Sequence, residues 1–322
     1  MVLLISTLTI GQNTNDINQV LNDLVFYSGK YVSPATEAVV YQASSGWMFS
    51  PKLKKEWSFT LGINTNVFIV PNSNRNFEIK NSDFQTFKIV GVNDDRVVNV
   101  PTTLGDKSDF YIQTNFLGNP IKTRFDGINQ EQVIYPYLQG SIALPKGFEL
   151  MAKYSLKNNL KNGSYQIYGA ALQYNISQHF SKLKEKNISI ATLFAYNKED
   201  LEANVILASG SNNLLGLKRL VSDVSSFQWQ INASKTFKKI EVMAGFVINS
   251  SNIKYNFEFE EVQQLNANDL LNSKIKDLDK TQYIYFGELS GRYNFYKNFY
   301  FQSTFSFGSE FNSNFGVQYE FN

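Results

Sequence analysis

Apolar residues alternate with polar ones at a period of two in many short segments of this chain. The last nine residues, NFGVQYEFN, carry Phe315, Val317, Tyr319 and Phe321 on one face and Gly316, Gln318 and Glu320 on the other. Such alternation is typical of a β-strand with one apolar face. The same pattern recurs at 57–63, 138–144, 148–156, 168–176, 188–196, 227–234, 242–248, 283–293 and 299–307. The pattern therefore predicts an all-β chain with at least ten strands.

Two architectures fit ten amphipathic strands, a soluble sandwich or barrel and a transmembrane barrel. The polar faces hold Gln, Asn, Ser, Thr and Gly more than Lys, and Tyr, Trp and Phe gather near strand ends, as in an interfacial girdle. Short connections such as PKG, TFKK and NFYKN alternate with long ones at 198–224 and 257–280. This asymmetry favours an outer-membrane barrel, with the short turns and the C-terminus in the periplasm.

We expect a closed antiparallel transmembrane β-barrel over residues 56–322, because backbone groups in lipid must all be paired. The strand-like stretches FQTFKIVGV (84–92) and DFYIQTNF (109–116) add a hairpin, which gives about 12 strands in a range of 10–14. The segment 315–321 is expected to close the barrel against the strand that begins near Trp57. Trp57, Phe246, Phe301 and Val317 are expected to face lipid.

The N-terminal residues have a different hydrophobic pattern from the rest of the chain. The apolar stretch MVLLISTLTIGQ (1–12) resembles a secretory signal peptide without its basic start, the alternative being a buried first strand. Residues 13–55 carry apolar residues at helical spacing, first around Ile17–Leu24 and again after Pro34. This segment is expected to be a helical plug inside the barrel, or a periplasmic contact for a partner.

Composition narrows the possible functions. The chain has 322 residues, a formal net charge of +2, no Cys and 15% aromatic residues. The near-neutral charge gives no reason to expect a nucleic-acid partner, and the absence of Cys removes disulfides and thiol chemistry. No apolar run reaches the ~18 residues that a membrane-spanning helix needs.

Charged and amide side chains on the polar strand faces are expected to line the lumen. They either fill a narrow barrel as a cross-strand network, which we favour, or line a polar conduit. The residues are Glu149, Lys153, Gln228, Gln230, Glu241, Glu288, Arg292, Gln318 and Glu320.

Catalytic and metal-binding signals are weak. The single histidine, His179, lies in the turn SQHFSKLKEKN near Ser177 and Ser181 with no third member of a triad. The carboxylates at 93–95 and 277–280 lack the spaced ligands and central Gly of a calcium loop. We expect no enzyme activity, no metal site and no cofactor.

Several stretches resemble a family of uncharacterised outer-membrane barrels of Bacteroidota. They are YVSPATEAVVYQASSGWMFSPKLKKEWSFTLGINTNVFIVP, VPTTLGD, YPYLQGSIALPKGFELMAKYSLK and GAALQYNISQHF, which cover most of residues 30–200. That family is similar to the long-chain fatty-acid transporter (FadL-like) barrels. The resemblance implies a plugged barrel in the outer membrane, reached by export through the periplasm.

Two functions are open at this point. The first is uptake or passage of a small hydrophobic molecule through a plugged barrel, with outer-membrane lipid as the surroundings. The second is a non-enzymatic accessory subunit of a larger outer-membrane complex for secretion or barrel assembly. In the second case the long loops, such as the apolar stretch ANVILASGSNNLLGLKRL, would contact partner proteins.

Overall fold

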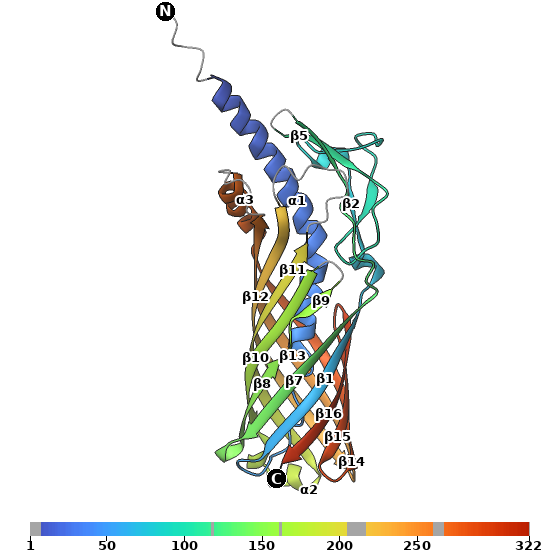
Figure 1. Ribbon diagram of the computed structural model, residues 1–322. Coiled ribbons are helices and arrows are strands. Elements are labelled where there is room, and N and C mark those ends of the chain that lie inside the picture. The colour runs from blue at the N-terminus through green and yellow to red at the C-terminus, as the bar shows by residue number, and fades with distance from the viewer. Residues whose placement is uncertain (1–7, 117–118, 161–162, 205–216, 260–266, 322) are drawn as a thin grey trace, which may run out of the picture.

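A tall β-barrel makes up most of the molecule in the computed structural model (Figure 1), which describes residues 8–116, 119–160, 163–204, 217–259 and 267–321. Its strands follow one another around the barrel in chain order. They are β1 (Phe59–Ile69), β7 (Gln132–Ala143), β8 (Phe148–Tyr154), β10 (Gly163–Asn175), β11 (Ile188–Asn204), β12 (Leu217–Phe237), β13 (Ile240–Phe259), β14 (Lys280–Tyr296), β15 (Phe299–Phe307) and β16 (Phe311–Phe321).

Every barrel strand pairs with a neighbouring strand along both of its edges, so the barrel is closed. The last strand, β16, pairs antiparallel with β1, with Phe321 opposite Phe59 and Val317 opposite Ile63. A short strand, β9 (Asn158–Leu160), pairs with β10 just beyond β8 and continues the line of β8. Of the eleven strand segments in the sheet, ten therefore go round the barrel. The expected closed antiparallel barrel is confirmed, at the lower end of the expected range of strand number.

The predicted extra hairpin does not join the barrel. Its residues form β3 (Lys88–Ile89) and β5 (Ile112–Phe116), which belong to a small three-stranded sheet at one end together with β6 (Asn119–Thr123). A second small sheet, formed by residues outside the predicted hairpin, pairs β2 (Asn76–Ile79) with β4 (Val98–Pro101). We call residues 70–131 the cap. Its strands alternate like those of the barrel, but their apolar side chains bury against a helix instead of facing a membrane. Period two shows that a strand is amphipathic and does not show which surface covers it.

Apolar side chains alternate to the outside of the barrel and form a continuous band. On β13 the outward positions are apolar from Ile240 to Ile248 and polar from Ser250 to Asn256. An aromatic belt follows each edge of the band. Exposed members of the belts are Tyr154, Tyr168, Tyr196, Phe227 and Tyr283 at one edge, and Trp57, Phe148, Phe237, Tyr293 and Phe321 at the other.

Strands β12 and β13 are longer than a bilayer requires. They contain 21 and 20 residues, whereas a tilted strand crosses a bilayer in about 9–11 residues. Their remaining halves project past the aromatic belt on the side where α3 (Ala267–Ile275) lies (Figure 1). The connections expected at 198–224 and 257–280 are consequently shorter, because parts of both segments continue these strands and β11.

The two ends of the barrel differ in their connections. One end, which we call the short-turn end, holds the β7–β8, β10–β11, β12–β13 and β14–β15 connections and the last residues of β16, with η3 (Pro145–Gly147), η4 (Ser177–His179) and α2 (Ser181–Glu185). The other, the long-loop end, holds the cap with η1 (Asn72–Asn74) and η2 (Asn81–Asp83), and also α3 (Ala267–Ile275) and η5 (Lys276–Leu278). This is the asymmetry expected from the sequence.

A single helix, α1 (Leu8–Ser44), enters the barrel from the long-loop end (Figure 1). The two helical stretches expected on either side of Pro34 are joined into one helix of 37 residues. The predicted signal peptide lies largely outside the described residues, which begin at Leu8. Within the described ranges, no helix is both long and apolar enough to cross a bilayer.

The outer half of α1 is held by the cap. Asp23 is buried and accepts hydrogen bonds from the backbone N–H groups of Gln85, Thr86 and Phe87 at 2.6–2.8 Å. Burial raises the pKa of Tyr31, whose protonated hydroxyl donates to the carbonyl of Asp126 at 2.7 Å. These contacts fix the direction in which the helix points into the lumen.

Candidate functional site

The chain that follows α1 runs through the lumen to the short-turn end before it enters β1. We call residues 45–54 the strap. Wall side chains donate hydrogen bonds to six backbone carbonyls of the strap and of the adjoining helix end. The bonds run from Gln139 to Trp47 (2.6 Å), Gln302 to Met48 (3.1 Å), Gln173 to Ser50 (3.0 Å), Asn175 to Pro51 (2.6 Å), and Lys153 to Ala43 (3.1 Å) and Ser45 (2.8 Å).

These bonds explain how irregular backbone can lie in the lumen. A buried carbonyl without a partner costs on the order of 1–3 kcal/mol, and the strap has no helix or sheet of its own to satisfy it. The amide side chains that serve it come from β7, β10 and β15, on different sides of the barrel. The wall therefore holds the strap in one position.

Lys153 lies at the centre of the lumen and is 1% exposed. Besides its two carbonyl acceptors, its Nζ lies 4.5 Å from the ring centroid of Trp47 and 4.7 Å from that of Tyr137. On the other side of the strap, Glu288 accepts from the N–H of Gly46 at 3.0 Å and from Gln230 at 2.7 Å. A buried cation and a buried anion thus both bind the backbone of the turn between α1 and the strap.

Gly46 is the point where the helix gives way to the strap. Its φ of +68° lies in the left-handed region, and a Cβ placed there would come within 2.9 Å of Asn314 and 3.0 Å of the Tyr137 hydroxyl. Only glycine avoids both the unfavourable backbone region and this collision.

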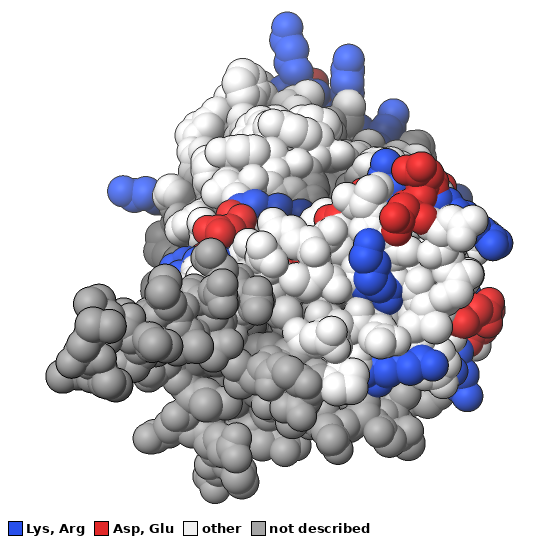
Figure 2. Space-filling view, turned by 90° about the horizontal axis from the view of Figure 1, so that it is seen from above, with Lys and Arg blue, Asp and Glu red and all other residues white. Residues whose placement is uncertain are grey.

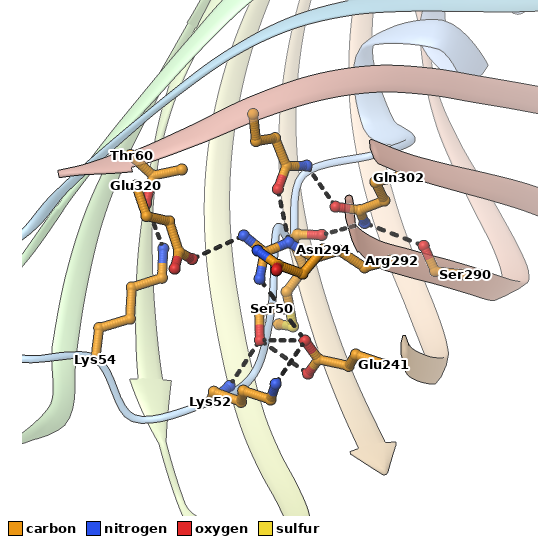
Figure 3. A network of polar contacts seen from close by, with 12 residues as sticks. Ser50, Lys52, Lys54, Thr60, Glu241, Ser290, Arg292, Asn294, Gln302 and Glu320 are labelled. Atoms are coloured by element: carbon orange, nitrogen blue, oxygen red, sulfur yellow. Dashed lines mark hydrogen bonds and ion pairs between the residues drawn. The ribbon is translucent and has the colours of Figure 1, made fainter. Parts of the chain in front are cut away.

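A network of ion pairs closes the short-turn end of the lumen (Figure 3). Three cations of the strap and wall face three glutamates, so the network is electrically balanced. The pairs are Lys54–Glu149 (2.6 Å), Lys52–Glu241 (3.4 Å), Arg292–Glu241 (3.8 Å) and Arg292–Glu320 (2.7 Å), with Ser50 donating to Glu241 (2.9 Å) and Arg292 to Gln318 (2.8 Å).

All nine lumenal residues expected from the sequence have inward-facing side chains. Glu149, Lys153, Gln230, Glu241, Glu288, Arg292, Gln318 and Glu320 take part in the contacts above, and Gln228 donates to Gln230 at 3.2 Å. They do not line an open path, since the strap lies among them. Gln139, Gln173 and Gln302 are not among the residues predicted to line the lumen, although they occupy inward positions in the same alternating strands.

An apolar cluster inside the lumen lies beneath the strap. Trp47 and Met48 pack against wall side chains that are mostly small. The wall members are Met151, Ala171, Ala191, Leu193 and Ala195, from β8, β10 and β11. The strap therefore fills a recess that would otherwise be an apolar pocket.

The hydrogen bonding of the lumen is uneven. Along β11 and β13, both side-chain polar atoms of Asn197, one oxygen of Glu199 and the carbonyl oxygen of Asn249 are buried without a partner in the described part of the chain. The amide oxygens of Gln139 and Gln173, whose N–H groups donate to the strap, are likewise buried without a partner among the described residues.

Two apolar grooves lie on the outside of the barrel. One, of about 650 Å³, crosses β16, β1, β7 and β8 over Gly140 and Ala152, and the other, of about 530 Å³, crosses β10 to β14 over Ala170. Both are bordered by exposed side chains of the apolar band. They therefore face the membrane and not the lumen.

The residues considered for catalysis or metal binding stay apart from the lumen. His179 lies at the short-turn end with its Nε2 2.5 Å from the Tyr174 hydroxyl. Asp94 lies in the cap, 3.3 Å from Lys88. Within the described ranges, no three His, Asp or Glu side chains are grouped to hold a metal ion.

Comparisons with solved structures find proteins of the bacterial outer membrane, each at low identity and low TM-score. The translocator domain of the autotransporter NalP from Neisseria meningitidis is 7% identical, with 90% of this chain and 95% of that chain covered and a TM-score of 0.35. A loop-deletion mutant of OmpT from Vibrio cholerae is 10% identical (82% and 98% covered, TM-score 0.26), and the Ralstonia pickettii toluene transporter TbuX is 11% identical (88% and 97%, TM-score 0.24). No activity is carried over from them.

The sequence itself was compared in two further ways. A search of curated proteins found no match. A protein family described as a family of unknown function, DUF6588, matches residues 1–321, and the chain belongs to this family.

Proposed function

We propose that this protein is a non-conducting outer-membrane barrel that acts through its cap and the outer half of α1, as an accessory subunit of a larger outer-membrane assembly. The observation that carries the proposal is the strap, held through six carbonyls by the wall and closed below by a balanced ion network. A lumen filled in this way offers no path for a solute. We therefore assign the function to the surfaces at the long-loop end.

The orientation follows from the connections. Short turns of outer-membrane barrels lie in the periplasm and longer loops lie outside. In that orientation the C-terminus is periplasmic, while the cap and the outer half of α1 lie at the cell surface. The chain itself crosses the lumen once, through α1 and the strap.

The passage of a small hydrophobic molecule is the second candidate. The observation in its favour is the apolar recess of Met151, Leu193 and the neighbouring alanines, which Trp47 and Met48 now occupy. Passage requires the strap to leave this recess, at the cost of the carbonyl bonds described above.

Labelling tests the orientation, since the chain contains no cysteine. A membrane-impermeant maleimide applied to whole cells should label Lys107→Cys in the cap and leave Lys146→Cys in the β7–β8 turn unlabelled until the outer membrane is opened. Labelling of the turn variant alone would contradict the proposal.

Purification in mild detergent tests the partner. A companion should be recovered in stoichiometric amount with the wild type and lost when the exposed cap residues Asp95, Arg96 and Lys107 are reversed in charge. The matched control reverses Lys182, Lys184 and Glu185 at the opposite end. A protein that purifies alone under every condition would favour the second candidate.

The proposal includes no enzymatic centre. We expect His179→Ala to leave every measured function and the assembled amount unchanged, because the imidazole lies at the barrel edge against Tyr174, away from the lumen. Loss of function in a variant that is exported and assembled normally would overturn this expectation.

A further inference from the structure

The short-turn end carries exposed charge of nearly one sign. Its five connections are residues 53–58, 144–147, 176–187, 238–239 and 297–298, and every one contains at least one exposed lysine. There is one exposed lysine each in the first, second and fifth connections, three in the third and two in the fourth. Against these eight lysines stand two exposed glutamates, Glu56 and Glu185. None of the eight forms an ion pair within the described part of the chain.

The backbone conformation of three of these lysines is unusual. Lys146, Lys238 and Lys297 have φ values of 62°, 53° and 44°, in the left-handed region that favours glycine or asparagine. In each of these tight turns a lysine therefore occupies a position where another residue would suit the backbone better. Residues held in sparsely populated backbone regions point to a role for the side chain.

The lysines all lie in the connections of the short-turn end. They adjoin the aromatic belt of the short-turn end, and the Nζ of Lys297 lies 5.3 Å from the ring centroid of Tyr296. Aromatic belts mark the boundary between acyl chains and headgroups. The ammonium groups just beyond the belt are thus placed at headgroup level.

The opposite end has a different charge pattern. Figure 2 views the molecule from the long-loop end, where basic and acidic side chains lie interspersed on the part that is described. The excess of lysine is therefore a property of the short-turn end. A protein partner would meet one side of this end, whereas a planar array of anions would meet all five connections at once.

We propose that the turn lysines bind the headgroups of anionic phospholipids in the leaflet at the short-turn end. Basic residues beside a membrane attract anionic lipid and hold the protein at a fixed depth. The ring of lysines, together with the aromatic belt, then sets the height of the barrel in the bilayer.

Trp57 is a natural reporter for this site. It lies at the short-turn end and is 60% exposed, whereas Trp47 is buried in the lumen. In the variant Trp229→Phe it is the remaining lipid-facing tryptophan. The whole chain is reconstituted in phosphatidylcholine vesicles that contain a minor fraction of brominated phosphatidylglycerol or, in a parallel sample, of brominated phosphatidylcholine.

Quenching of Trp57 should show a local enrichment of the anionic lipid of about fivefold, the factor that one engaged lysine supplies. The enrichment should fall toward one in K146N/K238N/K297N, in which asparagine suits the left-handed backbone and the fold is retained. It should persist in K107N/K254N/K276N, which removes three exposed lysines at the other end. Equal quenching by the two lipids in the wild type, or an unchanged preference in the turn variant, would overturn the proposal.

Discussion

Gly46 and Lys153 show at the scale of single residues how the lumen is closed. One allows the backbone to turn from helix to strap, and the other satisfies the carbonyls of Ala43 and Ser45 just before that turn. The role of Gly46 does not show in the local sequence, because glycine is common in turns. Alternation in β8 (Phe148–Tyr154) places Lys153 in the lumen but does not show which groups it binds. The residues that surround Gly46 and Lys153 in the lumen, Tyr137, Asn314 and Glu288, are distant in the sequence.

We expect Gly46→Ala to destabilise the folded barrel by about 2–4 kcal/mol, since it combines a left-handed backbone with a collision in a packed lumen. Gly91→Ala is the matched control, because Gly91 also has a positive φ but nothing lies within 4 Å of its Cβ position. Urea unfolding in detergent would measure both. Equal losses for the two variants would show that packing around Gly46 is unimportant.

We expect Lys153→Met to cost about 3–5 kcal/mol, because two buried carbonyls lose their donor and Glu288 loses the nearby cation. Lys157→Met should cost less than about 1 kcal/mol, since its pair with Glu202 is at the surface. The temperature at which the folded band is lost in a heat-modifiability gel would compare them. A wild-type temperature for Lys153→Met would contradict the role given to this lysine.

The closing strand matters most at the scale of elements. β16 has partners on both edges, and its last residues, Tyr319 to Phe321, pair with Leu61 to Phe59. Removing them would leave the end of β1 with unpaired backbone groups in lipid. The strand that ends the chain is thus also the strand that completes the sheet.

Deleting residues 319–322 should abolish membrane assembly. The control variant Tyr319→Ala keeps the backbone pairing and should assemble, with reduced stability at most. Heat-modifiability and protease resistance of membrane fractions would report the outcome. A truncated chain that still gave a heat-modifiable, protease-resistant product would refute the closing role.

The contact between α1 and the cap yields a second prediction at this scale. Asp23→Asn keeps the size of the side chain but weakens the bonds to three backbone N–H groups, so residues 84–87 should become accessible to protease. Asp94→Asn, which changes an exposed carboxylate of the same cap, should leave the digestion pattern unchanged. Equal resistance in both variants would show that Asp23 does not hold the cap.

The sequence predicts which residues form strands better than it predicts how the segments are arranged in space. Alternation located all ten barrel strands, from 57–63 to 315–321, because a membrane outside and a polar lumen inside impose period two. The same period in 84–92 and 109–116 suggested barrel strands, although those residues cover a helix. The path of the strap has no periodicity at all, and its partners come from β7, β10 and β15, so local sequence could not reveal it.

The whole molecule combines a membrane-facing band, a filled lumen and an extramembrane cap on one continuous chain. Positive and negative side chains near the strap are equal in number, and amide side chains of the wall donate hydrogen bonds to strap carbonyls. We therefore take the closed lumen to be the resting and working state of the protein. The central claim is that the strap does not leave the barrel.

A reversible lock between strap and wall tests this claim most directly. The hydroxyls of Ser45 and Ser306 lie 3.1 Å apart in the lumen, so S45C/S306C should form a disulfide in a chain without other cysteines. In planar bilayers the oxidised and reduced double variant and the single variant S306C should all remain non-conducting, because the strap stays in place with or without the lock. Conductance that appears on reduction and vanishes on oxidation would show that the strap leaves the lumen, and would contradict the account.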